Sequence, residues 1–177
     1  MLDIEIVKGF SFFLDMPQMY LSEIAQVSNV FEFNLNETIF KDGEDATDLY
    51  GVVDGEVELS LMVKDKIIKT DVQYEESVRT SIEIIEKDII VDSIFPGEVF
   101  GWSAFINPRI FTTNAKCSKS AKIISIPADK IKVIFDKEPQ VGYVFMERLA
   151  EIIVQRLRNR TEKLVETWSE AFDVNIV

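Results

Sequence analysis

A stretch in the second half of the chain has the residue types of an anion-binding loop. Residues Phe95 to Cys117 read FPGEVFGWSAFINPRIFTTNAKC. Pro96-Gly97 predicts a turn, and Gly101 is expected to open a single helical turn. Pro108-Arg109 then predicts a corner before a second strand from Phe111 onwards. Backbone N–H groups in the first turn of a short helix point into one concavity, where an arginine from the next segment can meet them. The pattern therefore predicts a cradle for an anion.

Glycine and arginine would carry the chemistry of this cradle. Gly101 permits a close backbone approach or a positive φ angle. The planar guanidinium of Arg109 can donate two N–H groups to two phosphate oxygens. The alternative interpretation is an ordinary turn glycine and a surface arginine. Further candidate donors, as backbone N–H groups or hydroxyls, are Ser103, Ala104, Thr112 and Thr113.

The stretch resembles the phosphate-binding cassette of the cyclic-nucleotide-binding domains, the family of the catabolite activator protein and the regulatory subunits of cyclic-AMP-dependent protein kinase. The family pattern runs roughly F-G-E, small and apolar residues, then P-R-x-x-T-x-x-A. The matching residues here are Phe100-Gly101-Trp102, Ser103-Ala104-Phe105, Pro108-Arg109, Thr112 and Ala115. The resemblance also covers the family's opening strands, at Ile39-Phe40, Gly43-Glu44, Leu49-Tyr50 and Gly55. It therefore extends over most of the chain.

This resemblance implies a fold and a ligand. The implied fold is mainly β with flanking helices: a cyclic-nucleotide-binding-type β-roll (double-stranded β-helix or jelly roll) followed by a long C-terminal helix. The implied ligand is cyclic AMP or cyclic GMP, with no other cofactor and no metal, and Arg109 would pair with the cyclic phosphate. Thr161, next to Arg160, falls where the activator protein presents hydroxyl side chains to the purine, which implies a base-capping role.

Trp102 departs from the family pattern. It occupies the position of the glutamate that accepts a hydrogen bond from the ribose 2′-hydroxyl, and an indole offers only a donor. Losing a charge-assisted hydrogen bond of ~1.5–3 kcal/mol would weaken affinity roughly tenfold to a hundredfold. Trp102 either packs into the roll or covers the pocket and stacks on a different ligand. Glu98 resembles a structural glutamate that precedes the cassette, so we do not expect it to replace the missing acceptor.

Composition restricts the function classes further. The 177 residues include no histidine, which removes the Ser-His-Asp, Cys-His and His-metal arrangements, and we expect no enzymatic activity. One cysteine excludes an internal disulfide. The formal net charge of −12 opposes nucleic-acid binding. We find neither an apolar run of ~20 residues nor a signal-peptide pattern, so we expect no membrane span and a cytoplasmic location.

Periodicity predicts the order of the elements. Residues 10–27 have mostly helical spacing, and residues 30–63 predict short strands with turn signals such as Asp54-Gly55. In the last of these strands we expect Val57, Leu59, Leu61 and Val63 to face inward. We predict a sensor domain over residues 1–137 with the cassette at 95–117, a dimerisation helix over 138–172 and a tail at 173–177. No DNA-reading domain is expected after the helix.

Two segments leave alternatives open. The link between Val63 and Phe95 predicts an extra or lengthened hairpin with Glu75-Glu76 near its tip, which is either a solvated decoration or a partner-binding edge. The long helix carries an apolar stripe interrupted by Arg156 and Arg160. That helix either pairs with its copy in a parallel homodimer or folds back on its own roll.

The leading hypothesis is a non-enzymatic sensor that binds a nucleotide-like anion and signals to an unidentified protein partner. The competing hypothesis is a degenerate relative that keeps the roll and the dimer but binds no cyclic nucleotide, acting as a structural or interaction protein.

Overall fold

The protein is a two-sheet β-roll with helices at one end, and its computed structural model describes residues 2–74 and 77–172. The helices are α1 (Ile4–Lys8), η1 (Ser11–Phe13), α2 (Gln18–Val27), η2 (Trp102–Phe105), α3 (Ala128–Lys137) and α4 (Pro139–Phe172). The strands are β1 (Asn29–Phe33), β2 (Thr38–Phe40), β3 (Asp48–Asp54), β4 (Val57–Tyr74), β5 (Ser77–Ile94), β6 (Val99–Phe100), β7 (Asn114–Cys117) and β8 (Ala121–Pro127).

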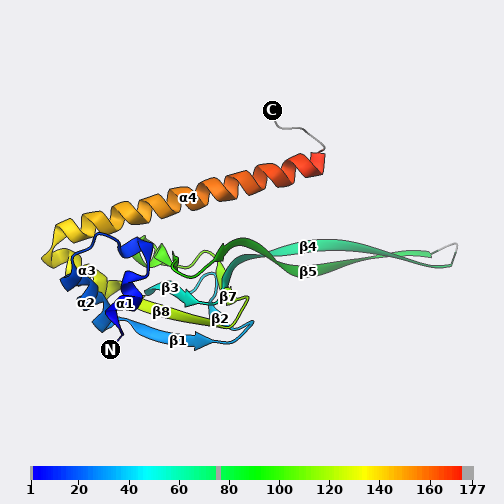
Figure 1. Cartoon of the computed structure of the whole chain (residues 1–177). Helices are drawn as coiled ribbons and strands as arrows, with labels where there is room; N and C mark the ends of the chain where they lie inside the picture. Colours follow the sequence, from blue (N-terminus) through cyan, green and yellow to red (C-terminus); the bar gives the residue numbers. More distant parts are fainter. Residues whose placement is uncertain (1, 75–76, 173–177) are drawn as a thin grey trace.

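Two antiparallel sheets form the roll, with strand orders β1-β8-β3-β6 and β2-β7-β4-β5 (Figure 1). Their inner faces meet in one apolar core, because the inward side chains of both sheets belong to the same cluster of buried residues. Its members on the strands are Phe40, Val52, Val57, Leu59, Ile94, Phe100, Ala115, Cys117, Ala121 and Ile123. The expected β-roll fold is confirmed.

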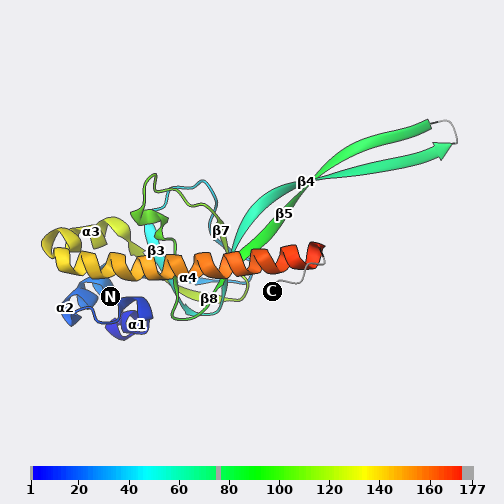
Figure 2. The same cartoon turned by 90° about the horizontal axis from the view of Figure 1, so that it is seen from above.

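A second apolar core joins the helices to one end of the roll. Phe145 of α4 is its centre: its ring lies 4.7 Å from that of Phe12, 4.9 Å from that of Phe135 and 4.9 Å from that of Phe105, centroid to centroid. Because Phe105 belongs to η2, the loop that resembles the cassette is packed directly against the long helix. Figure 2 shows α4 running from this core across the roll.

Strands β4 and β5 form a single long hairpin. Each has 18 residues, and they pair from Val57 with Ile94 to Tyr74 with Ser77. Only the first residues of β4, Val57 to Ser60, also pair with β7. The remainder, residues 61–74 and 77–90, projects from the roll as a twisted ribbon, which we call the arm (Figures 1 and 2). The predicted lengthened hairpin is confirmed, while Glu75-Glu76 lie outside the described residues.

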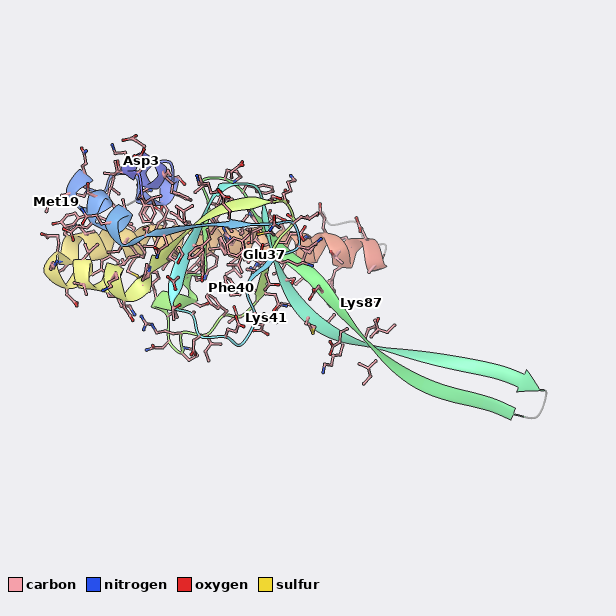
Figure 3. All side chains as sticks on the ribbon, turned by 90° about the horizontal axis from the view of Figure 1, so that it is seen from below. Asp3, Met19, Glu37, Phe40, Lys41 and Lys87 are labelled. Carbon is pink, nitrogen blue, oxygen red and sulfur yellow. The ribbon has the colours of Figure 1, made fainter. Side chains whose placement is uncertain are left out.

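The alternation expected from Val57 to Val63 holds only for Val57 and Leu59, the first two of the four positions predicted to face inward. Val57 and Leu59 are buried, but Leu61 is exposed and Val63 is only half-buried. A register shift at Leu59/Ser60 interrupts the pairing of β4 with β5 and lets Ser60 become buried instead. The prediction that Leu61 faces inward is therefore wrong, because the arm begins where the core of the roll ends. Near this base Lys87 forms an ion pair with Asp65 at 3.0 Å and extends from the arm in Figure 3.

The long helix leaves the roll about halfway along its length. Leu149 is buried, whereas Leu157 is 63% exposed and Leu164 and Val165 are also exposed. Arg156, which lies between Leu149 and Leu157, is buried. The domain boundaries and the homodimer stay predictions, and the tail at 173–177 lies outside the described residues. Within residues 2–74 and 77–172, no helix combines the length and hydropathy needed to cross a membrane.

Burial on α4 yields a stability prediction. Replacing Leu149, which is 1% exposed, with alanine should lower the free energy of unfolding by about 2–5 kcal/mol, because the removed methyl groups leave a cavity. The matched control is Leu35→Ala, at a residue 57% exposed, which should change it by less than about 0.5 kcal/mol. Urea unfolding curves of the two variants measure both values, and equal losses would contradict the position of the core.

Candidate functional site

The loop after β6 has the local geometry expected of the cassette. Gly101 adopts φ 81° and caps the N-terminal end of η2. A Cβ at this position would lie 2.9 Å from Tyr50 Cδ2 and 3.1 Å from the carbonyl oxygen of Asp48. The Ala104 N–H donates to the Gly101 carbonyl at 3.2 Å, which closes the single helical turn. Glycine is therefore required both by the left-handed backbone and by the close approach to β3.

Arg109 connects the cassette loop to α3. Its Nε donates to the Ala104 carbonyl oxygen at 2.9 Å, and its Nη2 donates to Asp129 Oδ1 at 2.6 Å. Asp129 lies in the first turn of α3. The hydrogen bond from Arg109, followed by the charge of the same guanidinium, lowers the pKa of the Asp129 carboxyl. Both side chains reach solvent, and the described structure thus pairs Arg109 with a carboxylate of its own chain.

Aromatic rings pack inside the roll beside the cassette loop. Phe111, two residues after Arg109, stacks on Phe40 with ring centroids 3.7 Å apart and ring planes 7° apart. Tyr50 and Phe100 stack at 5.3 Å in the same cluster. Figure 3 labels Phe40 within the roll. Burial, and secondarily the charges of Asp48 and Glu44, raises the pKa of Tyr50 to about 12. This part of the interior is apolar and uncharged.

Trp102 packs against α4. It is half-buried beside the helical core, and the guanidinium carbon of Arg156 lies 4.9 Å from the centroid of its ring. Arg156 also donates to Asp92 Oδ2 at 3.1 Å and to the Val99 carbonyl oxygen at 3.0 Å. Burial lowers the pKa of Arg156, and the Asp92 charge opposes this change. Of the two roles considered for Trp102, packing is the one that these contacts support.

The remaining candidate residues do not all come together. Ser103 is half-buried, Ala104 and Thr113 are buried, and Thr112 is exposed, all in the cassette loop. Arg160 and Thr161 lie on α4 instead. Thr161 is exposed and its hydroxyl donates to the Leu157 carbonyl oxygen at 2.8 Å. Arg160 Nη2 lies 3.8 Å from Asp92 Oδ2, which directs this side chain to β5 rather than to the cassette. As expected, Glu98 has a structural contact: its carboxylate accepts the Phe95 N–H at 2.8 Å.

Two interactions of the site were not predicted from the sequence. Asp129 has no motif around it, and its pairing with Arg109 depends on how α3 meets the cassette loop. In the sequence, Arg156 differs from its surroundings only as a break in an apolar stripe. A cation at a stripe position is a signal that the helix covers buried polar groups, and the carboxylate of Asp92 is one. Among the described residues, no cluster of three or more His, Cys, Asp or Glu side chains could hold a metal ion.

Comparisons with known proteins agree with this architecture. Residues 30–138 match the family model described as the cyclic nucleotide-binding domain. A putative cyclic nucleotide-binding protein from Geobacter metallireducens is 24% identical, with a TM-score of 0.67 over 89% of this chain and 99% of that one. The catabolite activator protein of Thermus thermophilus is 16% identical, with a TM-score of 0.59 over 90% of this chain and 62% of that one.

A eukaryotic structure is also similar. The regulatory domain of Toxoplasma gondii PKA, crystallised with cAMP, is 16% identical, with a TM-score of 0.60 over 84% of this chain and 48% of that one. A search of curated proteins finds no match. At these identities the solved structures establish the fold alone.

The geometry at Gly101 can be tested against a second glycine. Gly101→Ala combines a left-handed backbone, which costs about 1–2 kcal/mol, with steric overlap at Tyr50, which costs about 1–3 kcal/mol more. Gly43 also has a positive φ, but a Cβ there meets nothing within 4 Å, so Gly43→Ala should show only the backbone cost. Thermal and urea unfolding measure the difference. Indistinguishable losses in the two variants would mean that the loop does not approach β3 closely.

Proposed function

Because this chain belongs to the cyclic nucleotide-binding domain family, we propose that it is a non-enzymatic, cytoplasmic sensor module that binds a nucleotide-like anion and signals to a partner protein. The ligand class is a cyclic nucleotide, with cyclic AMP and cyclic GMP as the first compounds to test. The excess of acidic residues, with a net charge of −12, favours a protein partner over nucleic acid.

The observation that carries the proposal is the position of Arg109. Its guanidinium reaches the cassette carbonyl of Ala104 and the Asp129 carboxylate at once. The side chain of Asp129 is 79% exposed and that of Arg109 is 32% exposed, and ion pairs at such exposed positions contribute little to stability because water screens them. A phosphate that accepts two hydrogen bonds from the guanidinium is a stronger partner. A bound cyclic phosphate would therefore replace Asp129.

This exchange of partners supplies a signalling mechanism. Asp129 belongs to α3, and α4 begins at Pro139, only two residues after α3 ends. Taking Arg109 away from Asp129 removes one connection between the cassette loop and the helices. The ligand then shifts the population between two packings of roll against helix, in proportion to its difference in affinity for them. The long helix and the arm offer surfaces to which a partner protein can bind differently in the two packings.

A second candidate function is a structural or interaction protein that binds no cyclic nucleotide. Two observations favour it. The aromatic cluster of Phe40, Tyr50, Phe100 and Phe111 packs the interior beside the cassette loop. Trp102 also provides no acceptor for a ribose hydroxyl and is engaged with Arg156. In such a protein, the arm and α4 would form the surfaces that bind other proteins.

Calorimetric titration with cyclic AMP and cyclic GMP separates the two candidates. We expect binding that Arg109→Ala weakens at least about tenfold, since a charge-assisted hydrogen-bond pair is lost. Lys116→Ala, at an exposed lysine of β7, removes the same charge nearby and should leave the affinity unchanged. A Trp168→Phe background leaves Trp102 as the fluorescence reporter. An absence of heat and of fluorescence change at millimolar ligand would leave the second candidate standing.

The exchange of partners predicts a change in the titration of Asp129. Its pKa is lowered in the free protein by Arg109, so the ion pair persists below the ordinary carboxyl pKa and is lost as pH falls through the lowered one. When ligand saturates the protein, or when Arg109 is replaced with alanine, this pKa should rise toward its ordinary value. Carbon-detected NMR titration of the carboxyl group measures it. An unchanged pKa at saturation would contradict the mechanism.

We also propose that the sensor is a homodimer formed by the exposed stripe of α4. Leu157 and Leu164 are exposed and seven residues apart, so they lie on one face of the helix. Sedimentation at micromolar concentration should give twice the chain mass of 20.3 kDa. Leu157→Ser with Leu164→Ser should shift the protein to the monomer, while Glu162→Ser with Glu166→Ser should not. A wild-type monomer would remove this part of the proposal.

A further inference from the structure

A cavity of about 530 Å³ lies between the middle of α4, from Ile152 to Lys163, and the end of β5. Its walls come from η1, from β5 and the turn that follows it, and from α4. Four residues at the start of the cassette stretch, Phe95, Gly97, Glu98 and Val99, line it, but no residue from Gly101 to Thr113 does. The volume falls within the range of about 300–1,000 Å³ that is usual for small-molecule sites. The cavity is therefore large enough for a ligand and distinct from the site of Arg109.

Cations of α4 face this cavity. Arg156, Arg160 and Lys163 all line it, and their spacing of four and three residues places them on one side of the helix. Only two carboxylates, Asp92 and Glu98, oppose these three positive charges. In a chain with a net charge of −12, a cavity with a positive surplus is a local exception. Such a site attracts small anions more strongly than the surrounding surface does.

Neither carboxylate satisfies all of the cationic groups. Asp92 is shared: its Oδ2 lies 3.1 Å from Arg156 Nη1 and 3.8 Å from Arg160 Nη2. The carboxylate of Glu98 accepts a backbone N–H of the β5–β6 turn. Within the described part of the chain, the buried Nε of Arg160 has no hydrogen-bond partner and Lys163 forms no ion pair. A buried N–H without an acceptor is unfavourable, so a small movement of the Arg160 guanidinium that gives this N–H a ligand oxygen would stabilise the site.

We propose that this cavity binds a small organic oxyanion. Arg160 and Lys163 hold the anionic group. Arg156, already hydrogen-bonded to Asp92 and to the Val99 carbonyl oxygen, contributes positive charge to the wall of the cavity. Phe12 and Phe95 line the same cavity and provide apolar contact for the body of the ligand. A phosphate monoester and a carboxylate share the required chemistry. The site does not depend on Arg109, so it extends beyond the sensor function proposed above.

Such a ligand would connect segments that are far apart in the sequence. Arg160 and Lys163, which would hold the oxygens of the ligand, belong to α4, while Ser11 and Ser93 line the opposite walls in η1 and β5. Binding therefore favours the arrangement in which α4 lies against the roll. An oxyanion at this site and a nucleotide at the cassette would act on the same helix from two positions.

NMR titration with phenyl phosphate and with benzoate tests the proposal, and the two probes distinguish a phosphate ester from a carboxylate. We expect the Nε–H resonance of Arg160, identified by its loss in Arg160→Met, to shift on addition of at least one probe. The affinity should fall at least about tenfold in Arg160→Met and about threefold or more in Lys163→Met, as expected for lost charge-assisted hydrogen bonds. Methionine keeps the length of the apolar stem, and both side chains reach solvent, so folding should be retained.

Two controls separate this site from the cassette. Arg158→Met removes one exposed cation from the same helix outside the cavity and should leave the affinity unchanged. Arg109→Ala should also leave it unchanged, whatever its effect on cyclic nucleotide binding. The proposal is overturned if neither probe shifts the Arg160 resonance at millimolar concentration. It is equally overturned if Arg160→Met binds as wild type does, or if Arg109→Ala alone removes binding.

Discussion

Beyond the apolar core around Phe145, the contacts of the buried guanidinium of Arg156 connect the long helix to the roll. It reaches Asp92 on β5, the carbonyl of Val99 on β6 and the ring of Trp102 on η2. A charge at this depth is tolerated only when its donors are satisfied, and burial indeed lowers the pKa of this arginine. A displacement of α4 would break all three contacts together. The base of the arm, the cassette loop and the helix are therefore coupled through one side chain.

The cassette loop has a second cation on its other side. Arg109 joins η2, through the Ala104 carbonyl, to α3, while Arg156 joins η2, through Trp102, to α4. The aromatic contact between Phe105 and Phe145 lies between these two connections. A short helical turn that has contacts with both helices cannot change its own conformation without altering theirs. This arrangement suits a regulatory domain, because an event at the loop has a direct physical route to α4.

Predictions that depend on patterns within short segments were correct. Contacts between segments far apart in the sequence were not predicted. The short strands, the helical turn at Gly101 and the lengthened hairpin depend on local periodicity and turn residues, whereas the β-roll was implied by the family resemblance. The inward position of Leu61 failed because a register shift is a property of paired strands. Asp129 and Asp92 acquire their roles from arginines 20 and 64 residues away. No rule of sequence spacing covers such distances, so these two carboxylate partners of the arginines could be identified only from the structure.

The strand pairing of the arm has less support than that of the roll. Among the described strands, beyond Ser60 it pairs only with itself, so each residue pair is supported by its neighbours and by nothing beneath it. A two-stranded ribbon is marginally stable alone, so the pairing of the arm depends on its attachment to the roll near Val57 and Ile94. Its amide hydrogens should exchange with solvent faster with distance from the roll, through local opening that leaves the core intact.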